Sequence, residues 1–201
     1  MDAVRVSALR QHLAGTGWLE AVGGFAGSLR RSVSRRGAGE LLLVGTAAYE
    51  PWHLAAHLED EAAWSAVPRL APTLLRHAPP ADAAAHLAHG LRRLAAAGRG
   101  ATVLVVAPDA AGAPLLERVQ DARRHGATVL ALDGAATGEP GGLGGLAHER
   151  LAVGTAAEEP FDLAQHLVSA AAGQPPARRG GLDRLAELAG RLTAPPAISR
   201  W

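Results

Sequence analysis

The stretch ATVLVVAPDAAGAPLLERVQDARRHGATVLAL, residues 101–132, decides the fold of this chain. A β-branched apolar run, Thr102–Val106, ends in a turn of small residues at 107–112, and a helical pattern follows up to Gly126. A second apolar run then covers Thr128–Leu132. Strand, helix and strand joined by so short a crossover predict two neighbouring parallel strands. Ligands of open parallel sheets bind where strands end in loops, so the turn at 107–112 is a candidate site.

The alternation of strands and helices extends through the rest of the chain. Apolar periodicity and turn residues predict helices within 3–32, a strand at Leu41–Val44, a helix at Pro51–Trp64, a short strand at Ala66–Leu70, a helix from Asp82 to Ala97, an extended glycine-rich loop at Gly134–Gly145, a strand at Arg150–Val153 and a helix at Phe161–Ala172. This order predicts an α/β fold of the flavodoxin-like type, a three-layer sandwich in which helices flank a mainly parallel sheet of four to five strands. We expect an N-terminal helical segment at 1–39 that packs on the core or on a dimer mate. The α/β core then covers 40–173, and a linker, helix and tail follow at 174–201.

Composition limits the chemistry of the chain. With 201 residues it can form one compact domain, and its core must consist of Ala, Leu and Val because only 3% of the residues are aromatic. All 20 basic residues are arginines, so no lysine can form a Schiff base. A net charge of +1 argues against a nucleic-acid partner, and the lack of cysteine excludes disulfides. We find neither a signal-peptide pattern nor a membrane-spanning apolar run, and expect a cytoplasmic protein without a membrane partner.

Three segments carry motifs known from one family of proteins. Residues 41–49 read LLLVGTAAY, like a first strand with a Gly-Thr-Ser-Tyr type turn, and residues 103–132 read like the later strand, phosphate loop, helix and strand. Residues 165–185, QHLVSAAAGQPPARRGGLDRL, read like a last core helix with its tail. In these segments the chain resembles the sugar isomerase (SIS) family, most closely the isomerase half of glucosamine-6-phosphate synthase and its relatives. The resemblance covers about residues 40–190 and implies an SIS fold.

The two loops that hold the substrate phosphate in that family are altered here. Family members use Ser and Thr hydroxyl groups, because a dianion at the start of a helix needs hydrogen-bond donors. Residues 107–112 carry no hydroxyl group, Pro108 lacks a backbone donor, and the carboxylate of Asp109 repels a phosphate. In the first loop only Thr46 and Tyr49 keep a hydroxyl group. The resemblance therefore implies a crevice that has lost the usual phosphosugar site. The ligand contacts that it implies are Gly45, Thr46, Tyr49, Asp109, Gly112 and Arg179.

Catalysis would require a base and an acid. Aldose–ketose isomerisation moves a proton between adjacent carbons, and Glu50 and His166 are the candidate base and acid for that step. Glu50 precedes the first crossover helix, and some SIS isomerases place a histidine in the last core helix. The alternative is that Glu50 is a favourable charge near a helix start and that His166 is a partly buried helix residue.

The sequence offers little support for a metal or a cofactor. His53 and His57 are spaced i, i+4 on one helix face, as in zinc-binding H-E-x-x-H motifs, but the glutamate and a third ligand are missing from the pattern. The run GGLGG at 141–145 precedes a strand and is no dinucleotide fingerprint. We therefore expect neither a metal ion nor a cofactor.

Three functions remain open. The favoured one is a non-catalytic SIS protein that binds a carbohydrate derivative and acts as a regulator or scaffold, as a homodimer. The second is a sugar-phosphate isomerase or aminosugar-processing enzyme with an unusual substrate, in which Arg76 or Arg179 replaces the missing hydroxyl groups. The third is an interaction subunit of a larger enzyme, because synthases of this family carry two SIS modules and this chain has one. The expected partners are a sugar or sugar phosphate, a second copy of the chain, or another protein.

Overall fold

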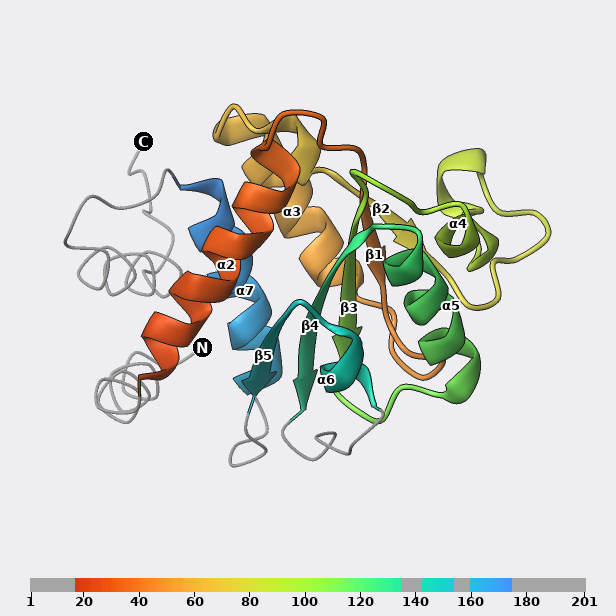
Figure 1. The fold of residues 1–201 in the computed structure, drawn as a ribbon. Coiled ribbons are helices and arrows are strands. Elements are labelled where there is room, and N and C mark those ends of the chain that lie inside the picture. Colours follow the sequence, from red (N-terminus) through yellow and green to blue (C-terminus); the bar gives the residue numbers. More distant parts are fainter. Residues whose placement is uncertain (1–16, 135–141, 154–159, 175–201) are drawn as a thin grey trace, which may run out of the picture.

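The computed structural model describes residues 17–134, 142–153 and 160–174, whose arrangement Figure 1 shows. The helices are α2 (Trp18–Ser34), α3 (Trp52–Trp64), α4 (Arg92–Ala95), α5 (Ala113–Arg124), α6 (Leu143–Leu146) and α7 (Pro160–Gly173), with 3-10 turns η1 (Pro68–Leu70) and η2 (Ala85–Leu87). The strands are β1 (Leu41–Val44), β2 (Pro72–Leu75), β3 (Thr102–Ala107), β4 (Thr128–Gly134) and β5 (Glu149–Val153). They form one parallel sheet in the order β2-β1-β3-β4-β5.

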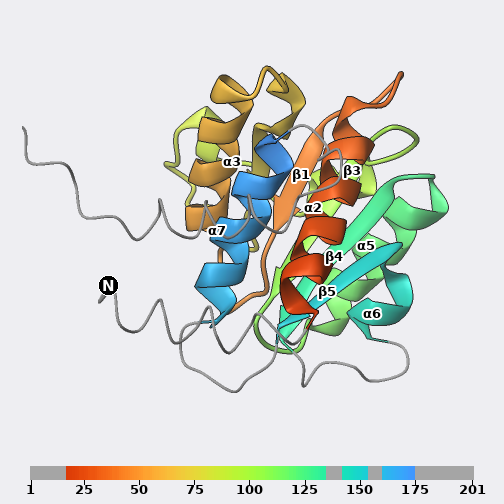
Figure 2. The same ribbon diagram turned by 90° about the vertical axis from the view of Figure 1, so that its left-hand side faces the viewer.

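The sheet is covered by helices on both faces. Side chains alternate along each strand, so Leu43, Leu104 and Leu130, which are in register, all point to one face. There they pack against α2, α3 and α7, and their neighbours in the strands pack against α5 on the other face. Figure 2 shows α7 between α2 and α3. Burial on both faces explains why the central strands are continuous apolar runs, and the predicted three-layer α/β fold is confirmed.

Helix α2 belongs to this core. Its residues Val22, Phe25 and Leu29 are buried against the sheet and α7. At the far end of α7 the guanidinium of Arg30 donates hydrogen bonds of 2.9 Å to the carbonyl oxygens of Ala172 and Gly173. A cation at these carbonyl groups compensates the partial negative charge of the helix C-terminus. None of the described helices has the length and apolar content that crossing a membrane requires.

Three predicted elements differ from the structure. The strand expected at Ala66–Leu70 lies later, as β2, because Ala66 adopts a positive φ of 56° and Pro68 begins the turn η1. β2 is an edge strand, where its first residue, Pro72, costs no hydrogen bond of the sheet interior.

The helix expected from Asp82 to Ala97 reduces to η2 and α4. The reason is that the chain here returns to the end of β2. The Arg76 amide donates to the His89 carbonyl oxygen at 2.8 Å, and Gly90 forms a bridge with Arg76.

The predicted loop at Gly134–Gly145 also differs, since α6 begins at Leu143; residues 135–141 lie outside the described ranges.

Candidate functional site

The candidate site follows from the strand order. From β1 the chain crosses to β2 on one side, and from β2 it returns to β3 on the other side of β1. The connections therefore reverse direction between β1 and β3, and a crevice at the carboxyl ends of these strands is where such folds bind ligands. Two loops meet at this edge, residues 45–51 after β1 and residues 108–112 after β3 (Figure 1).

The loop after β1 folds back tightly on itself. The Tyr49 amide donates to the Thr46 carbonyl oxygen at 3.2 Å, which brings the Tyr49 carbonyl oxygen against the Cα of Gly45. A Cβ at position 45 would overlap that oxygen and would lie 2.7 Å from Cδ of Pro51, so only glycine fits. The ring of His77 closes the loop from β2, because its Nε2 lies 3.0 Å from the Gly45 carbonyl oxygen.

Two buried side-chain oxygens at this loop lack hydrogen-bond partners. Thr46 is 4% exposed, and its Oγ1 has no partner among the described residues. Gln165 of α7 is 2% exposed and donates from Nε2 to the Tyr49 hydroxyl at 2.8 Å and to Asp162 Oδ1 at 3.1 Å. Its other end, Oε1, has no partner within the described ranges. Tyr49 thus links two residues, each with a buried oxygen that has no hydrogen bond to replace the one it would form with water.

The side chain of Tyr49 contacts the first turns of α7. Its ring meets Phe161 edge-on, with 6.0 Å between the ring centroids. Burial raises the pKa of the Tyr49 phenol above its usual value of 10, and the charge of Asp162 adds to this rise, whereas the hydrogen bond from Gln165 opposes it. The phenol therefore stays protonated at neutral pH and can donate a hydrogen bond at this end of the sheet.

Glu50 forms an ion pair. Nε of Arg76 lies 3.0 Å from both carboxylate oxygens, and Nε1 of Trp52 donates to Oε2 at 2.8 Å. The guanidinium carbon also lies 5.2 Å from the centroid of the Trp52 ring, within the range of a cation–π contact. The carboxylate and the guanidinium are both about three-quarters buried.

The loop after β3 places the other predicted contacts at the same sheet edge. Asp109 is exposed, and Gly112 is the N-cap residue of α5, whose start has no side-chain capping hydrogen bond. The Gly112 carbonyl oxygen accepts hydrogen bonds from Leu115 and Leu116. Arg179 falls outside the described residues.

His166 lies among other histidines. Its ring centroid is 4.6 Å from that of His53 and 4.1 Å from that of His57, both on α3. Burial is the largest cause that lowers the pKa of His166, and together with the two neighbouring imidazoles it brings the value to about 4. Among the described residues no hydrogen bond or ring contact joins Glu50 to His166, the predicted base and acid.

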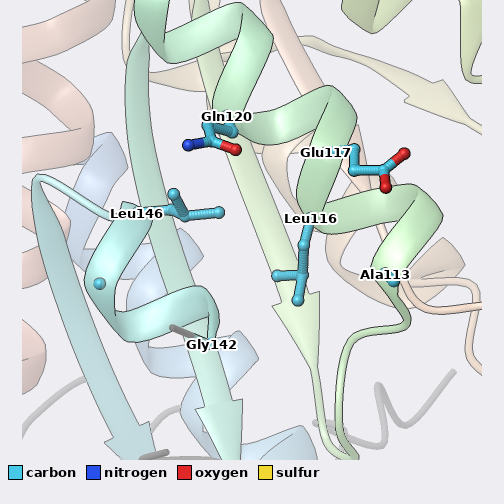
Figure 3. Close-up of a pocket in the computed structure, with 7 residues that line it drawn as sticks. Ala113, Leu116, Glu117, Gln120, Gly142 and Leu146 are labelled. Atoms are coloured by element: carbon cyan, nitrogen blue, oxygen red, sulfur yellow. The ribbon is translucent and has the colours of Figure 1, made fainter. Parts of the chain in front are cut away.

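A separate groove lies on the face of the sheet that α5 covers, opposite the face covered by α2, α3 and α7. It has a volume of about 440 Å³ between α5 and α6. Figure 3 shows Leu116 of α5 and Leu146 of α6 facing one another across it. None of the predicted site residues lines this groove, and its one ionisable lining residue is Glu117.

Comparison with known proteins fixes the fold. No family model and no curated protein matches the sequence. A solved structure of a candidate phosphosugar isomerase from Silicibacter pomeroyi DSS-3 matches with a TM-score of 0.51 and 19% identity, over 90% of this chain and 51% of that chain. The chain has an SIS-type fold.

Two further structures match less well. A candidate sugar-binding protein from Salmonella typhimurium LT2 gives a TM-score of 0.49 and 16% identity over 90% of this chain and 54% of its own. The C-terminal domain of glucosamine-fructose-6-phosphate aminotransferase from Francisella tularensis gives 0.40 and 10% over 94% and 48%. This SIS-type chain thus spans about half the length of each protein. Identities this low establish a fold, and a ligand must be argued from the site.

Sequence reasoning missed part of the edge. His77 lies in no motif, and Gln165 begins the quoted segment 165–185 but was assigned no role there. Asp133, fully buried at the end of β4, pairs with Nε of Arg150 at 2.9 Å. One signal was available. A polar residue that directly follows an apolar run, as Asp133 does, marks the carboxyl edge of a parallel sheet.

Proposed function

We propose that this SIS-type chain binds a carbohydrate derivative at the carboxyl ends of β1 and β3. The pair of buried, unpartnered oxygens of Thr46 and Gln165, connected through Tyr49, carries the proposal. Leaving such a group unpaired costs about 1–3 kcal/mol. Sugar hydroxyl groups donate and accept hydrogen bonds, and so can satisfy a threonine hydroxyl and an amide oxygen together.

The charges at this edge favour a neutral sugar or an amino sugar. Asp109 brings an exposed carboxylate to it, the charge of Glu50 is compensated by Arg76, and residues 107–112 offer no hydroxyl donor. A dianionic phosphate would meet repulsion from Asp109. The neighbour described as a candidate phosphosugar isomerase supports sugars as the ligand class.

The proposed role is that of a non-catalytic regulator or scaffold. Glu50 is engaged by Arg76 and Trp52, and the described residues contain no contact between Glu50 and His166. A carboxylate held in this way positions the loop. We include the cytoplasmic location expected from the sequence in this proposal.

A thermal-shift screen against aminosugars, sugar phosphates and nucleotide sugars tests the binding. A ligand at 100 times its dissociation constant stabilises the fold by about 2.7 kcal/mol. Thr46→Val should abolish the shift, because it removes the hydroxyl group and keeps the shape. The matched control is Thr102→Val: Thr102 is equally buried with an unpartnered Oγ1, but it begins β3 at the opposite edge. Equal shifts in both variants, or no shift with any sugar, would contradict the proposal.

Arg76 favours a second candidate, a sugar-phosphate isomerase. Its guanidinium is a cation about three-quarters buried beside the loop after β1, where it could bind an anionic substrate in place of the missing hydroxyl groups. Glu50 would then be the base and His166 the acid. Turnover of a sugar phosphate that Glu50→Gln abolishes would establish this function. Turnover that Glu50→Gln leaves unchanged would exclude the assigned base.

A homodimer or a protein partner completes the proposal. Trp64, at the end of α3, is 76% exposed, and Trp52 at its start is 41% exposed. Exposed tryptophans favour a contact surface, since this residue is enriched at interface centres. Sedimentation velocity of wild type and Trp64→Ala measures it: a dimer that Trp64→Ala weakens supports this surface, and a monomer at high micromolar concentration contradicts the dimer.

A further inference from the structure

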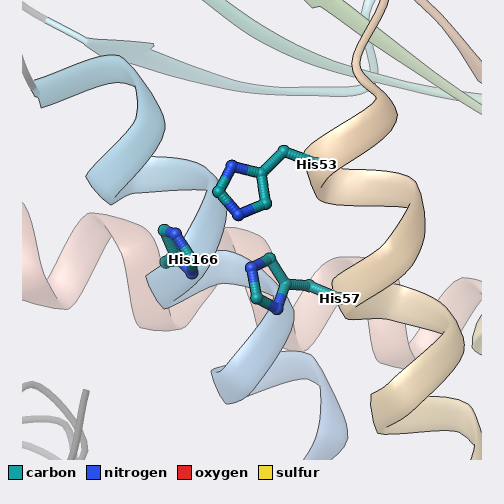
Figure 4. A group of neighbouring side chains, drawn as sticks. All are labelled: His53, His57 and His166. Carbon is teal, nitrogen blue, oxygen red and sulfur yellow. The ribbon is translucent and has the colours of Figure 1, made fainter.

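Three imidazoles come together between α3 and α7. His53 and His57 are one turn apart on α3, and Figure 4 shows both reaching toward His166 of α7. The ring centroids of the three pairs lie 4.7, 4.6 and 4.1 Å apart. One ring nitrogen of each residue can be chosen so that all three atoms lie within 4.8 Å of one another. The spacing i, i+4 supplied two of these residues, and the fold supplies the third.

These rings lack the hydrogen bonds that imidazoles need. Nε2 of His57 is buried without any partner among the described residues. The described ranges contain no hydrogen bond from a ring nitrogen of His53 or His166 either. A buried imidazole nitrogen usually binds a carboxylate, a carbonyl group or water, so the unpartnered Nε2 of His57 beside two further imidazoles calls for an explanation.

The cluster also favours neutral rings. Burial is the largest cause that lowers the pKa of His57 and of His166, and the neighbouring imidazoles add to it. Asp60 on α3 and Asp162 on α7 oppose this effect by their charges without cancelling it. Neutral imidazoles keep a lone pair, and that lone pair is what a metal ion binds.

We propose that His53, His57 and His166 form a binding site for a divalent transition-metal ion, with Zn²⁺ as the expected occupant. Imidazole nitrogen is a preferred ligand of zinc, and three histidines with one open position are a known zinc donor set. Tetrahedral zinc with bonds of about 2.0–2.1 Å places its ligand nitrogens about 3.4 Å apart. Side-chain rotation of the partly exposed rings can close the remaining distance. The ion would supply a partner to one nitrogen of each ring and would connect α3 to α7.

If these positions served only to pack α3 against α7, we would expect apolar side chains there instead of imidazoles. Apolar side chains pack between helices without losing hydration, as Leu54 and Leu58 of α3 do. His53 is exposed, so an ion can reach the site from solvent. The proposal does not depend on the proposed sugar ligand, whose contacts are Thr46 and Gln165.

Metal binding to the tag-free full-length chain tests the proposal. After treatment with a chelator, Zn²⁺ is titrated by calorimetry, and Co²⁺ by its visible absorption, which reports coordination geometry. We expect one ion per chain and a higher melting temperature with Zn²⁺. His53→Gln and His166→Gln should each weaken binding by about 100-fold or more, since even disturbing a group outside the coordination sphere costs 10–100-fold. His53 is exposed, so its variant should keep the fold, as circular dichroism would verify.

The matched control is His125→Gln. His125 is exposed at the C-cap of α5, away from the cluster, and its variant should bind like wild type. No binding at micromolar Zn²⁺, binding that survives both His53→Gln and His166→Gln, or an equal loss in His125→Gln would each overturn the proposal. Sugar-dependent thermal shifts would be unaffected by any of these outcomes, so the two proposals fail separately.

Discussion

Arg76 and Glu50 stand 26 residues apart in the sequence and meet in an ion pair, with Nε 3.0 Å from both carboxylate oxygens. Arg76 follows β2 and Glu50 follows β1, so the contact ties together the two loops at this end of the sheet. Only the parallel pairing of β1 with β2 brings the two residues to one edge.

Breaking this pair should destabilise the fold. The side chains are 21% and 25% exposed, so removing one partner leaves a poorly hydrated charge. We expect a double-mutant cycle of Glu50→Gln and Arg76→Gln in urea to give a coupling energy of about 0.5–3 kcal/mol. The matched control is the ion pair of Arg93 with Glu40, each 40% exposed, which should give at most about 1 kcal/mol. Equal coupling in both cycles would contradict the assigned burial.

The titration of Tyr49 should be directly visible. It is the only tyrosine of the chain, so ultraviolet absorbance reports it without interference from another phenol. Burial raises its pKa, so we expect a midpoint above 10 in the folded protein and near 10 in denaturant. Because the folded pKa is raised, the associated stability is complete below pH 10 and is lost as pH rises through the folded pKa.

Gln165→Leu provides the test of the cause. The hydrogen bond from Gln165 lowers the pKa of Tyr49, so its removal should move the midpoint still higher. A midpoint at or below 10 in the folded wild type would show that the phenol is hydrated.

The sheet could be predicted because it is locally encoded. Apolar runs at Leu41–Val44 and Thr102–Val106 can be buried on both faces only in a parallel sheet, and the helical pattern between Gly112 and Gly126 defines the crossover. The region 66–97 failed because its pattern is weak and its backbone is decided by contacts with the end of β2. Tertiary contacts override propensity in such segments.

The sequence predicted which residues lie in each loop of the candidate site, but not the contacts between those loops and the helices. Sequence order places Thr46, Tyr49 and Glu50 after the first strand, but it does not show that Gln165 reaches Tyr49. The contact of His166 with His53 and His57 could not be predicted for the same reason. His166 is more than a hundred residues from His57, and no spacing rule connects them. Contacts between α3 and α7 arise from packing on one face of the sheet.

Arg30 should contribute to stability through the end of α7. Its two hydrogen bonds to carbonyl oxygens involve a charged donor, and such bonds contribute about 1.5–3 kcal/mol. We expect Arg30→Ala to lower the free energy of unfolding in urea by an amount in this range. Within the described residues its exposed neighbour Arg31 donates a side-chain hydrogen bond only to Ser28, so Arg31→Ala should change the free energy of unfolding by less than about 0.5 kcal/mol. Similar losses in both variants would indicate a general charge effect.

Gly45 should tolerate no side chain. A Cβ there would overlap the Tyr49 carbonyl oxygen and approach Pro51, which forces the loop to move. Overpacking of this kind costs about 1–3 kcal/mol, and we expect Gly45→Ala to be destabilised by that amount in thermal unfolding. Gly24→Ala is the matched control: Gly24 is exposed within α2 with nothing within 4 Å of its Cβ position, so it should stabilise the helix by about 0.5–1 kcal/mol. Because Gly45 supports Tyr49, the midpoint of the Tyr49 titration should also fall toward 10 in Gly45→Ala and stay unchanged in Gly24→Ala. A Gly45→Ala protein with wild-type stability and an unaltered tyrosine titration would mean that this loop does not hold Tyr49 in place.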